Sequence, residues 1–216
     1  MSSNTTYRLQ PFSGPASAGH LAKLHAELLG HSPVALLGPQ FMEQFYYADL
    51  PRMDLIFGAI AYVDDVPAGF IVGTANSSSF MQQALKKKFF KVASVMALSV
   101  LRSPRRMAAV WEALQIMRNL PPPDAESAAA GEILSFGVLP QFRTREFLMK
   151  TKLRISQDLL KAVMSEFAAR GVPRARVIVD HDNLEARLFY LGNGWQPGMG
   201  LVPGWRKKTV EFLWQP

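Results

Sequence analysis

The stretch Asn183–Trp195, with the sequence NLEARLFYLGNGW, decides how the second half of the chain is interpreted. Asp182 or Asn183 can cap a short helix over Leu184–Leu191, because the side-chain oxygen of either residue can accept a hydrogen bond from a free N–H of the first helical turn. The preceding chain contains an apolar strand, an amphipathic helix closed by Gly171, and a second strand, over Glu132–Leu139, Ile155–Arg170 and Arg174–Asp180. Lys208–Trp214 adds a final strand. Strands that alternate with helices predict a parallel or mixed α/β sheet.

The first half of the chain predicts two helices packed on a hairpin. After a short strand at Tyr7–Phe12, a helix is expected to start at Ser17 as its N-cap and to end near Gly30. A second helix is expected over Pro39–Leu50. Two apolar runs separated by an Asp-Asp turn then predict a hairpin of buried strands, Leu55–Val63 and Ala68–Thr74.

The composition favours one globular domain over residues 1–216, since 49% of the residues are apolar and 19% are charged. The absence of cysteine excludes a disulfide scaffold, a thiolate zinc site and a cysteine nucleophile. His20, His25 and His31 are spaced by five and six residues and do not share one helical face, so no metal is expected. The amino terminus has no apolar signal core, and we expect a cytoplasmic protein.

The net charge of +7 is concentrated in one segment. Residues 82–118 contain eight basic side chains and one acid, whereas the rest of the chain contains sixteen of each. The segment belongs to a basic insertion and linker, residues 76–131, with expected helices over Gln82–Leu101 and Arg105–Asn119. Such a surface suits peripheral contact with an anionic membrane, although a helical lid or a homodimer contact fits the same pattern. Nucleic acid is not expected, because no reading motif is present.

Two motifs in the second half together resemble those of the GNAT acyltransferase superfamily. Asn183–Trp195 is similar to its N-x-x-A-x-x-F-Y-x-x-x-G-F signature, with Trp195 in place of the usual Phe. Glu132–Arg143, EILSFGVLPQFR, is similar to the strand that ends in V-x-P-x-x-R. The resemblance implies a mixed, centrally splayed sheet flanked by helices, with a helical insertion before the central strand. It also implies transfer of an acyl group, here expected to be acetyl, from acyl-CoA to an amine by direct attack on the thioester.

The resemblance implies roles for named residues in this sequence. Tyr190 would protonate the departing CoA thiolate, and Glu132 would serve as a base for the amine. The acetyl-CoA arm would lie against Phe136, Gly137 and Val138 and contact Asn183 and Phe189. Structural alternatives remain open: Tyr190 as a packing residue, and Asn183 as a plain helix cap. Asp180 and His181 end the neighbouring strand and are further candidates for the base.

The phosphate loop departs from the family pattern Q/R-x-x-G-x-G/A. No glycine occurs between Gly137 and Gly171, so bare backbone amides cannot be expected to hold the pyrophosphate. One alignment, counted from Arg143, puts Glu146 and Leu148 at the small positions. The other, counted back from Leu159, puts Arg154 and Ser156 there and implies an insertion after Arg143. We favour the second, with Arg143, Lys152, Arg154 and Ser156 at the phosphates.

Two functions therefore stay open from the sequence. The first is an N-acetyltransferase with a phosphate clamp built from side chains. Its acceptor would be a small amine, and an amino sugar is implied by resemblance to bacterial relatives that share the long basic insertion. The second is a non-catalytic domain of the same fold that binds a membrane or a protein partner through its basic helices. Affinity for CoA separates the two.

Overall fold

The computed structural model describes residues 5–12, 15–102, 131–203 and 208–215. Within them, a seven-stranded sheet has the order β1-β2-β3-β4-β5-β7-β6. Every neighbouring pair is antiparallel except β4 and β5, which are parallel. The strands are β1 (Tyr7–Pro11), β2 (Phe57–Val63), β3 (Val66–Thr74), β4 (Gly131–Val138), β5 (Ala175–Asp180), β6 (Gln196–Pro203) and β7 (Lys208–Trp214). The expected mixed sheet flanked by helices is confirmed.

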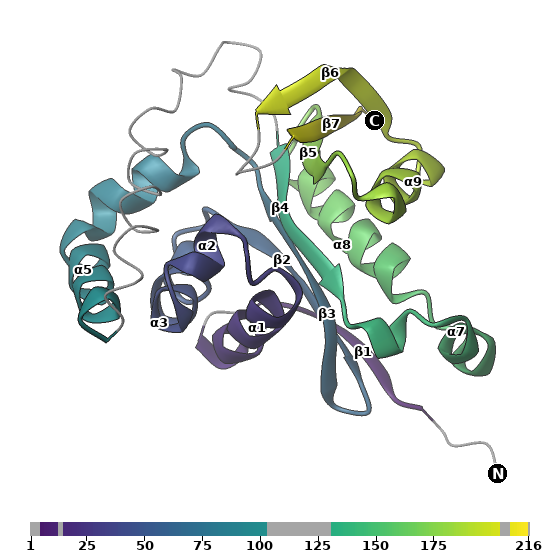
Figure 1. The fold of residues 1–216 in the computed structure, drawn as a ribbon, viewed down its shortest axis with the longest axis horizontal. Coiled ribbons are helices and arrows are strands. Elements are labelled where there is room, and N and C mark those ends of the chain that lie inside the picture. The colour runs from purple at the N-terminus through teal and green to yellow at the C-terminus, as the bar shows by residue number, and fades with distance from the viewer. Residues whose placement is uncertain (1–4, 13–14, 103–130, 204–207, 216) are drawn as a thin grey trace.

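Helices cover both faces of this sheet (Figure 1). One layer contains α1 (Pro15–Leu28), α2 (Pro33–Leu36), α3 (Pro39–Phe41), the π-helix η1 (Met42–Tyr46), α4 (Asp49–Arg52) and α5 (Phe80–Arg102). The other side carries α8 (Ile155–Ala169) and α9 (Leu184–Gly192), which follow the short helices η2 (Pro140–Phe142) and α7 (Arg145–Thr151). Each face has its own hydrophobic core. The helices expected at Ile155–Arg170 and Leu184–Leu191 agree with α8 and α9 to within one residue.

The amphipathic pattern of α8 accounts for its position on the sheet. Leu159, Val163 and Phe167 recur at four-residue spacing and are fully buried against β2 and β3. Gly171 follows with a φ of +65°, the left-handed conformation that ends a helix at low cost when the residue is glycine.

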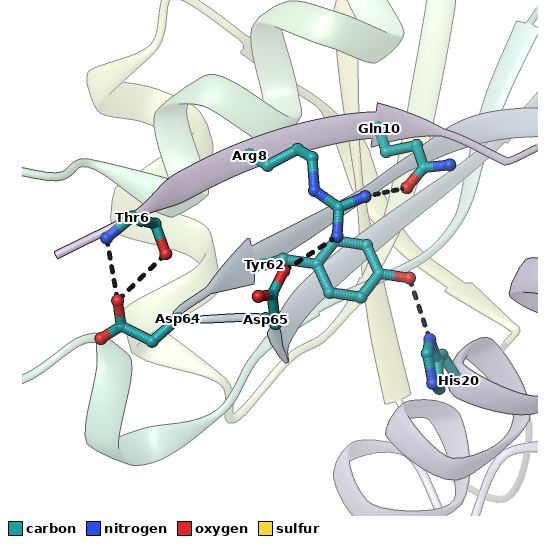
Figure 2. A network of polar contacts seen from close by, with 7 residues as sticks. All are labelled: Thr6, Arg8, Gln10, His20, Tyr62, Asp64 and Asp65. Carbon is teal, nitrogen blue, oxygen red and sulfur yellow. Dashed lines mark hydrogen bonds and ion pairs between the residues drawn. The ribbon is translucent and has the colours of Figure 1, made fainter.

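The β2–β3 hairpin is closed by the expected Asp-Asp turn, with positive φ at both Asp64 and Asp65. Figure 2 shows how polar contacts join this turn to β1 and to the residue before it: Asp64 accepts hydrogen bonds from the backbone and the hydroxyl of Thr6, and Arg8 Nη2 lies 3.4 Å from Asp65 Oδ1. Arg8 lies 4.4 Å above the ring of Tyr62, whose hydroxyl is 2.9 Å from His20 Nδ1. The network ties the edge strand β1 to both β2 and α1.

Two expectations for the first half are wrong in detail. Ser17 does not cap the first helix; it is buried inside α1, which begins at Pro15, a residue well suited to the first helical position. The single helix expected over Pro39–Leu50 is divided into α3, η1 and α4. The division buries Phe45, Tyr46 and Tyr47 in succession, which a regular helix on a flat core does not allow.

The insertion is described only in part. The first expected helix corresponds to α5, whose backbone leaves helical geometry at Lys88 (φ −130°, ψ 26°). The second, Arg105–Asn119, and most of the linker lie outside the described residues. Among the residues described, no helix is both long and apolar enough to cross a membrane.

Candidate active site

The two central strands separate after three residues of pairing. In β4, Gly131, Glu132 and Ile133 pair with Ala175, Arg176 and Val177 of β5. Beyond that point β4 continues to Val138 and β5 to Asp180, without any further register between them. The sheet is therefore splayed at its centre, as expected.

A bulge in β4 lies at the start of this separation. Ile133 pairs with Gly73 of β3 and Ser135 pairs with Val72, so Leu134 is an extra residue. The bulge bends β4 while its pairing with β3 continues to Val138. As a result, the edge of β4 that faces β5 is left without a strand partner from Leu134 onward, within the described part of the chain.

A cavity of about 370 Å³ occupies the space between the separated strands. Residues from both strand ends, from α9 and from the start of α8 form its wall: Leu29, Ile133–Val138, Arg143, Ser156, Val177–Asp180, Asn183, Glu185, Ala186, Phe189 and Tyr190. Of the residues proposed from the sequence, the cavity brings together Phe136, Gly137, Val138, Arg143, Ser156, Asn183, Phe189 and Tyr190. Glu132, Lys152 and Arg154 are not part of its wall.

Tyr190 is held in a defined position in the cavity wall. Its ring is 3% exposed and contacts the rings of Trp195, Phe189 and Phe212 at centroid distances of 5.2, 5.5 and 6.0 Å. Burial raises the pKa of the Tyr190 phenol above its ordinary value. The phenol therefore stays protonated at neutral pH and keeps a proton that it could donate.

Asn183 and Phe189 meet the cavity from α9. The side chain of Asn183 accepts a hydrogen bond from the backbone of Ala186 at 3.0 Å, so its role as a helix cap is confirmed. The two Nδ2 protons of an asparagine are not used by such a bond. Phe189 packs against Phe136 at 5.5 Å, so an aromatic pair joins α9 to β4 in the cavity wall.

In the connection from β4 to α8, the helix α7 occupies Arg145–Thr151, and α8 begins at Ile155, directly after Arg154. Ser156, in the first turn of α8, lines the cavity, whereas Glu146 and Leu148 do not. This first turn has N–H groups that no side-chain cap from Arg154 satisfies.

The basic residues around this turn differ in their contacts. Arg143 lines the cavity and forms an ion pair with Glu185 of α9, with 2.6 Å between Nη1 and Oε1. Both side chains are substantially exposed, so the pair contributes little stability and can open at low cost. Lys152 and Arg154 are exposed and precede α8, and Arg154 Nη1 lies 3.4 Å from Gln157 Oε1.

Glu132 lies at the base of the separated strands, in a cluster of charges. Arg176 donates to its carboxylate from Nε at 2.9 Å and from Nη2 at 2.8 Å, and Arg176 Nη1 is 3.6 Å from Glu211. Burial raises the pKa of Glu132, and the neighbouring Arg176 opposes that shift. A carboxyl group with a raised pKa is better matched to proton transfer near neutral pH than an ordinary glutamate.

Sequence reasoning missed part of the wall and one neighbour of Glu132. Ser135 lines the cavity and shares a hydrogen bond with Tyr46, whose buried phenol lies close enough to Glu132 to feel its charge. Only the bulge in β4, which the sequence does not show, turns Ser135 toward this position. His181 is exposed and lies 3.1 Å from its neighbour Asp182, as a turn histidine would. Asp180 is part of the cavity wall.

No group of three or more metal-binding side chains occurs among the described residues. Within the described part of the chain, the site contains a strand edge without a strand partner, a protonated phenol, a helix start without a side-chain cap and a nearby arginine.

Solved structures place this architecture in a known fold class. The chain is similar to an acetyltransferase of the GNAT family from Streptococcus pneumoniae (TM-score 0.55, 12% identity, 98% of this chain and 100% of that chain covered). It is similar to SsHAT, with a TM-score of 0.58, 17% identity, and coverage of 97% of this chain and 98% of that chain. It is also similar to an aminoglycoside acetyltransferase in complex with coenzyme A, with a TM-score of 0.54, 12% identity, and coverage of 98% of this chain and 95% of that chain. No protein-family model and no curated protein matches the sequence. The chain has the GNAT fold.

Proposed function

We propose that the protein is an acyl-CoA-dependent N-acyltransferase that transfers an acetyl group to a small amine. The observation that carries the proposal is the cavity between the splayed ends of β4 and β5, with a strand edge on one side and Tyr190 on the other. An extended amide-containing chain can hydrogen-bond to such an edge as an added strand would, because no described strand pairs with this edge beyond Ile133.

The residues present fit acyl-CoA. The edge at Phe136–Val138 would bind the two amides of the pantetheine arm, and Asn183 would contact the same arm through its free amide protons. Arg143, Lys152 and Arg154 would bind the phosphates by charge, with Ser156 and the start of α8 beside them. Acyl-CoA supplies an activated thioester carbon for attack by the amine.

The phosphate clamp differs chemically from a glycine-rich loop. Side-chain cations carry full charge but must be ordered on binding, whereas backbone amides are already fixed. Arg143 must also leave Glu185 before it can bind a phosphate. We therefore expect CoA affinity to depend strongly on salt and to rise when Glu185 is replaced by Gln.

Two side chains would manage the protons. Tyr190 holds a proton that can be delivered to a departing thiolate, because its raised pKa keeps the phenol neutral. Glu132, which lies outside the cavity wall, would accept a proton from the acceptor ammonium through an intervening water, and its raised pKa supports that role. The contact with Arg176 would stabilise the ionised carboxylate before the transfer.

The proposal extends to amino sugars as acceptors, in line with the resemblance of the basic insertion to that of bacterial relatives. The test is an acetyl-transfer assay that measures free thiol as CoA is released. The chain has no cysteine, so the protein adds no thiol background. Glucosamine-type sugars, polyamines and amino acids would be compared, with Tyr190→Phe as the matched control. Thiol release that depends on an amine and falls in the variant supports the proposal, and release equal in both proteins contradicts it.

A second candidate, a non-catalytic domain of the same fold, is favoured by the glycine-free stretch between Gly137 and Gly171. It predicts neither CoA binding nor thiol release with any amine.

A further inference from the structure

Two irregular segments of backbone meet at one hydrogen bond beside the cavity. The first is the π-helix η1, after which the backbone N–H of Tyr47 donates to the carbonyl of Met42, five residues earlier, at 2.8 Å. The second is the bulge at Leu134 in β4. Together they bring the phenol of Tyr46 and the hydroxyl of Ser135 into a hydrogen bond. Both kinds of irregularity are common next to functional sites. We call Tyr46 and Ser135 the hydroxyl pair.

The bulge decides which side of β4 Ser135 occupies. Figure 1 shows α1 on one side of β4 and α8 on the other. Ile133 and Phe136 pack into the core that contains α8, and Leu134 packs into the core that contains α1. Strict alternation after Leu134 would return Ser135 to the α8 side. The extra residue keeps Ser135 on the α1 side, where Tyr46 is buried, so Ser135 joins the cavity wall to a phenol in the core.

The phenol of Tyr46 is held in a fixed direction inside that core. The residue is 2% exposed, and its ring contacts the rings of Tyr47 and His25 at centroid distances of 5.0 and 6.4 Å. A buried phenol needs a hydrogen-bond partner, and Ser135 supplies one. Burial, followed by the charge of Glu132, raises the pKa of Tyr46 above its ordinary value, so the phenol is neutral at neutral pH.

The hydroxyl pair lies between the cavity and Glu132. Ser135 is part of the cavity wall and Glu132 is not. Tyr46 is bonded to Ser135 and lies near enough to Glu132 for the carboxylate charge to act on it. Charged or titratable neighbours of Tyr46 or Glu132 come from several other elements: His25 of α1, Tyr47 after η1, Arg176 of β5 and Glu211 of β7.

We propose that Ser135 and Tyr46 carry the proton of the acceptor amine from the cavity toward Glu132. The inference rests on the acetyl transfer proposed above and supplies the path between the amine and its base. The acceptor ammonium donates to Ser135 Oγ, the Ser135 hydroxyl donates to Tyr46 Oη, and the Tyr46 hydroxyl donates to the water beside Glu132. One proton enters at Ser135 as one leaves Tyr46, so both hydroxyls keep their composition. The amine becomes neutral, Glu132 becomes protonated, and no phenolate is formed.

The experiment measures thiol release by the wild type, Tyr46→Phe and Ser135→Ala as a function of pH. The acceptor is the amine with the fastest wild-type release among the amino sugars, polyamines and amino acids. At neutral pH we expect kcat/KM to be on the order of 100-fold lower in either variant, because a proton-transfer path is lost. The deficit disappears above the pKa of the acceptor amine, since an amine that is already neutral needs no base.

A double variant and a matched control separate a proton path from a structural effect. Tyr46→Phe combined with Ser135→Ala loses no more activity than the stronger single variant, because two members of one path act as a unit. Tyr47→Phe is the control: it removes the neighbouring buried hydroxyl, which contacts His25, and leaves the hydroxyl pair in place. We expect Tyr47→Phe to retain the wild-type pH profile, and every variant to retain the acetyl-CoA affinity of the wild type in calorimetry.

Circular dichroism and thermal unfolding establish that each variant is folded, and Ser135→Ala decides the matter if Tyr46→Phe is not. Full activity in both single variants, with thiol release by the wild type, overturns the relay and leaves the acetyl transfer standing. A deficit that is equal at every pH, or that Tyr47→Phe shares, also overturns the relay, because the loss is then structural. A wild type that releases no thiol with any amine contradicts the acetyl transfer itself and removes the relay with it.

Discussion

His25 makes the folded protein sensitive to acid. The imidazole is fully buried in α1, with Nδ1 2.5 Å from the hydroxyl of Tyr47 and Nε2 2.6 Å from the hydroxyl of Ser32. Burial lowers the pKa of His25 from 6.5 to about 4. Both ring nitrogens are satisfied by hydroxyl groups, and no carboxylate takes part in either bond, so the neutral imidazole is the form that the core accepts.

The size and sign of the effect follow from proton linkage. The unfolded chain binds a proton at this histidine below pH 6.5, whereas the folded chain does so only below about pH 4. The contribution of neutral His25 to the free energy of unfolding is therefore fully present above pH 6.5 and decreases as the pH falls toward about 4. The difference of about 2.5 between the unfolded and folded pKa values of His25 corresponds to at most roughly 3 kcal/mol of unfolding free energy.

The assay is urea unfolding of the wild type and of His25→Gln at pH 7 and at about pH 4.5. At neutral pH the variant is less stable, because the buried hydrogen bonds and packing are lost. At the lower pH that deficit shrinks by about 2–3 kcal/mol, because the wild type must release the proton of His25 in order to fold, whereas the variant has no such proton. His31→Gln, which replaces an exposed imidazole, is the matched control. A deficit of equal size at both pH values would refute the reasoning.

Four further predictions concern the proposed active site. Tyr190→Phe lowers kcat by about 100-fold or more, with CoA affinity unchanged, because the ring still fills its place while the proton is lost. In the wild type, the transfer rate falls as the pH drops toward the raised pKa of Glu132, because the protonated carboxyl cannot act as a base. Glu132→Gln removes this dependence of the rate on acid pH. Arg143→Ser weakens CoA binding and reduces its salt dependence in titration calorimetry. Gly137→Ala places a Cβ 2.9 Å from Leu28 Cδ1 and lowers stability to urea by about 1–2 kcal/mol.

Each of these has a contrary result. Unchanged turnover in Tyr190→Phe with every acceptor removes the phenol from the mechanism. If the transfer rate of Glu132→Gln still falls at low pH as in the wild type, another residue is the titrating group. Equal CoA affinity in Arg143→Ser at low salt excludes that guanidinium from the phosphate clamp. Full stability of Gly137→Ala shows that Leu28 has room to move away from β4.

The regular elements could be predicted where one face of an element is buried. In α8, Leu159, Val163 and Phe167 repeat at helical spacing, and the predicted bounds agree with the structure within one residue. The strand β6, in contrast, begins Gln-Pro-Gly-Met-Gly, which is typical of a loop. It pairs with β7 through an irregularity between Pro197 and Leu201, and such pairing depends on a neighbour distant in sequence.

The site was predictable in its chain position more than in its geometry. Tyr190 and Asn183 can be proposed from the sequence because the motif over Asn183–Trp195 sets them at fixed spacing, and both lie in the cavity wall. Ser135 was not found, because a β-bulge at Leu134 changes which side of β4 it occupies, and periodicity in one strand does not reveal a bulge. The partner of Arg143 was equally hidden, since Glu185 lies 42 residues away in the chain.

The most direct test of the central claim is calorimetric titration of the wild-type protein with acetyl-CoA at modest salt. The account predicts micromolar binding, since the unpaired edge of β4 and the cations at α8 together hold both ends of the molecule. Absence of binding at millimolar acetyl-CoA would contradict it and would leave a GNAT fold that does not use its cleft for the cofactor.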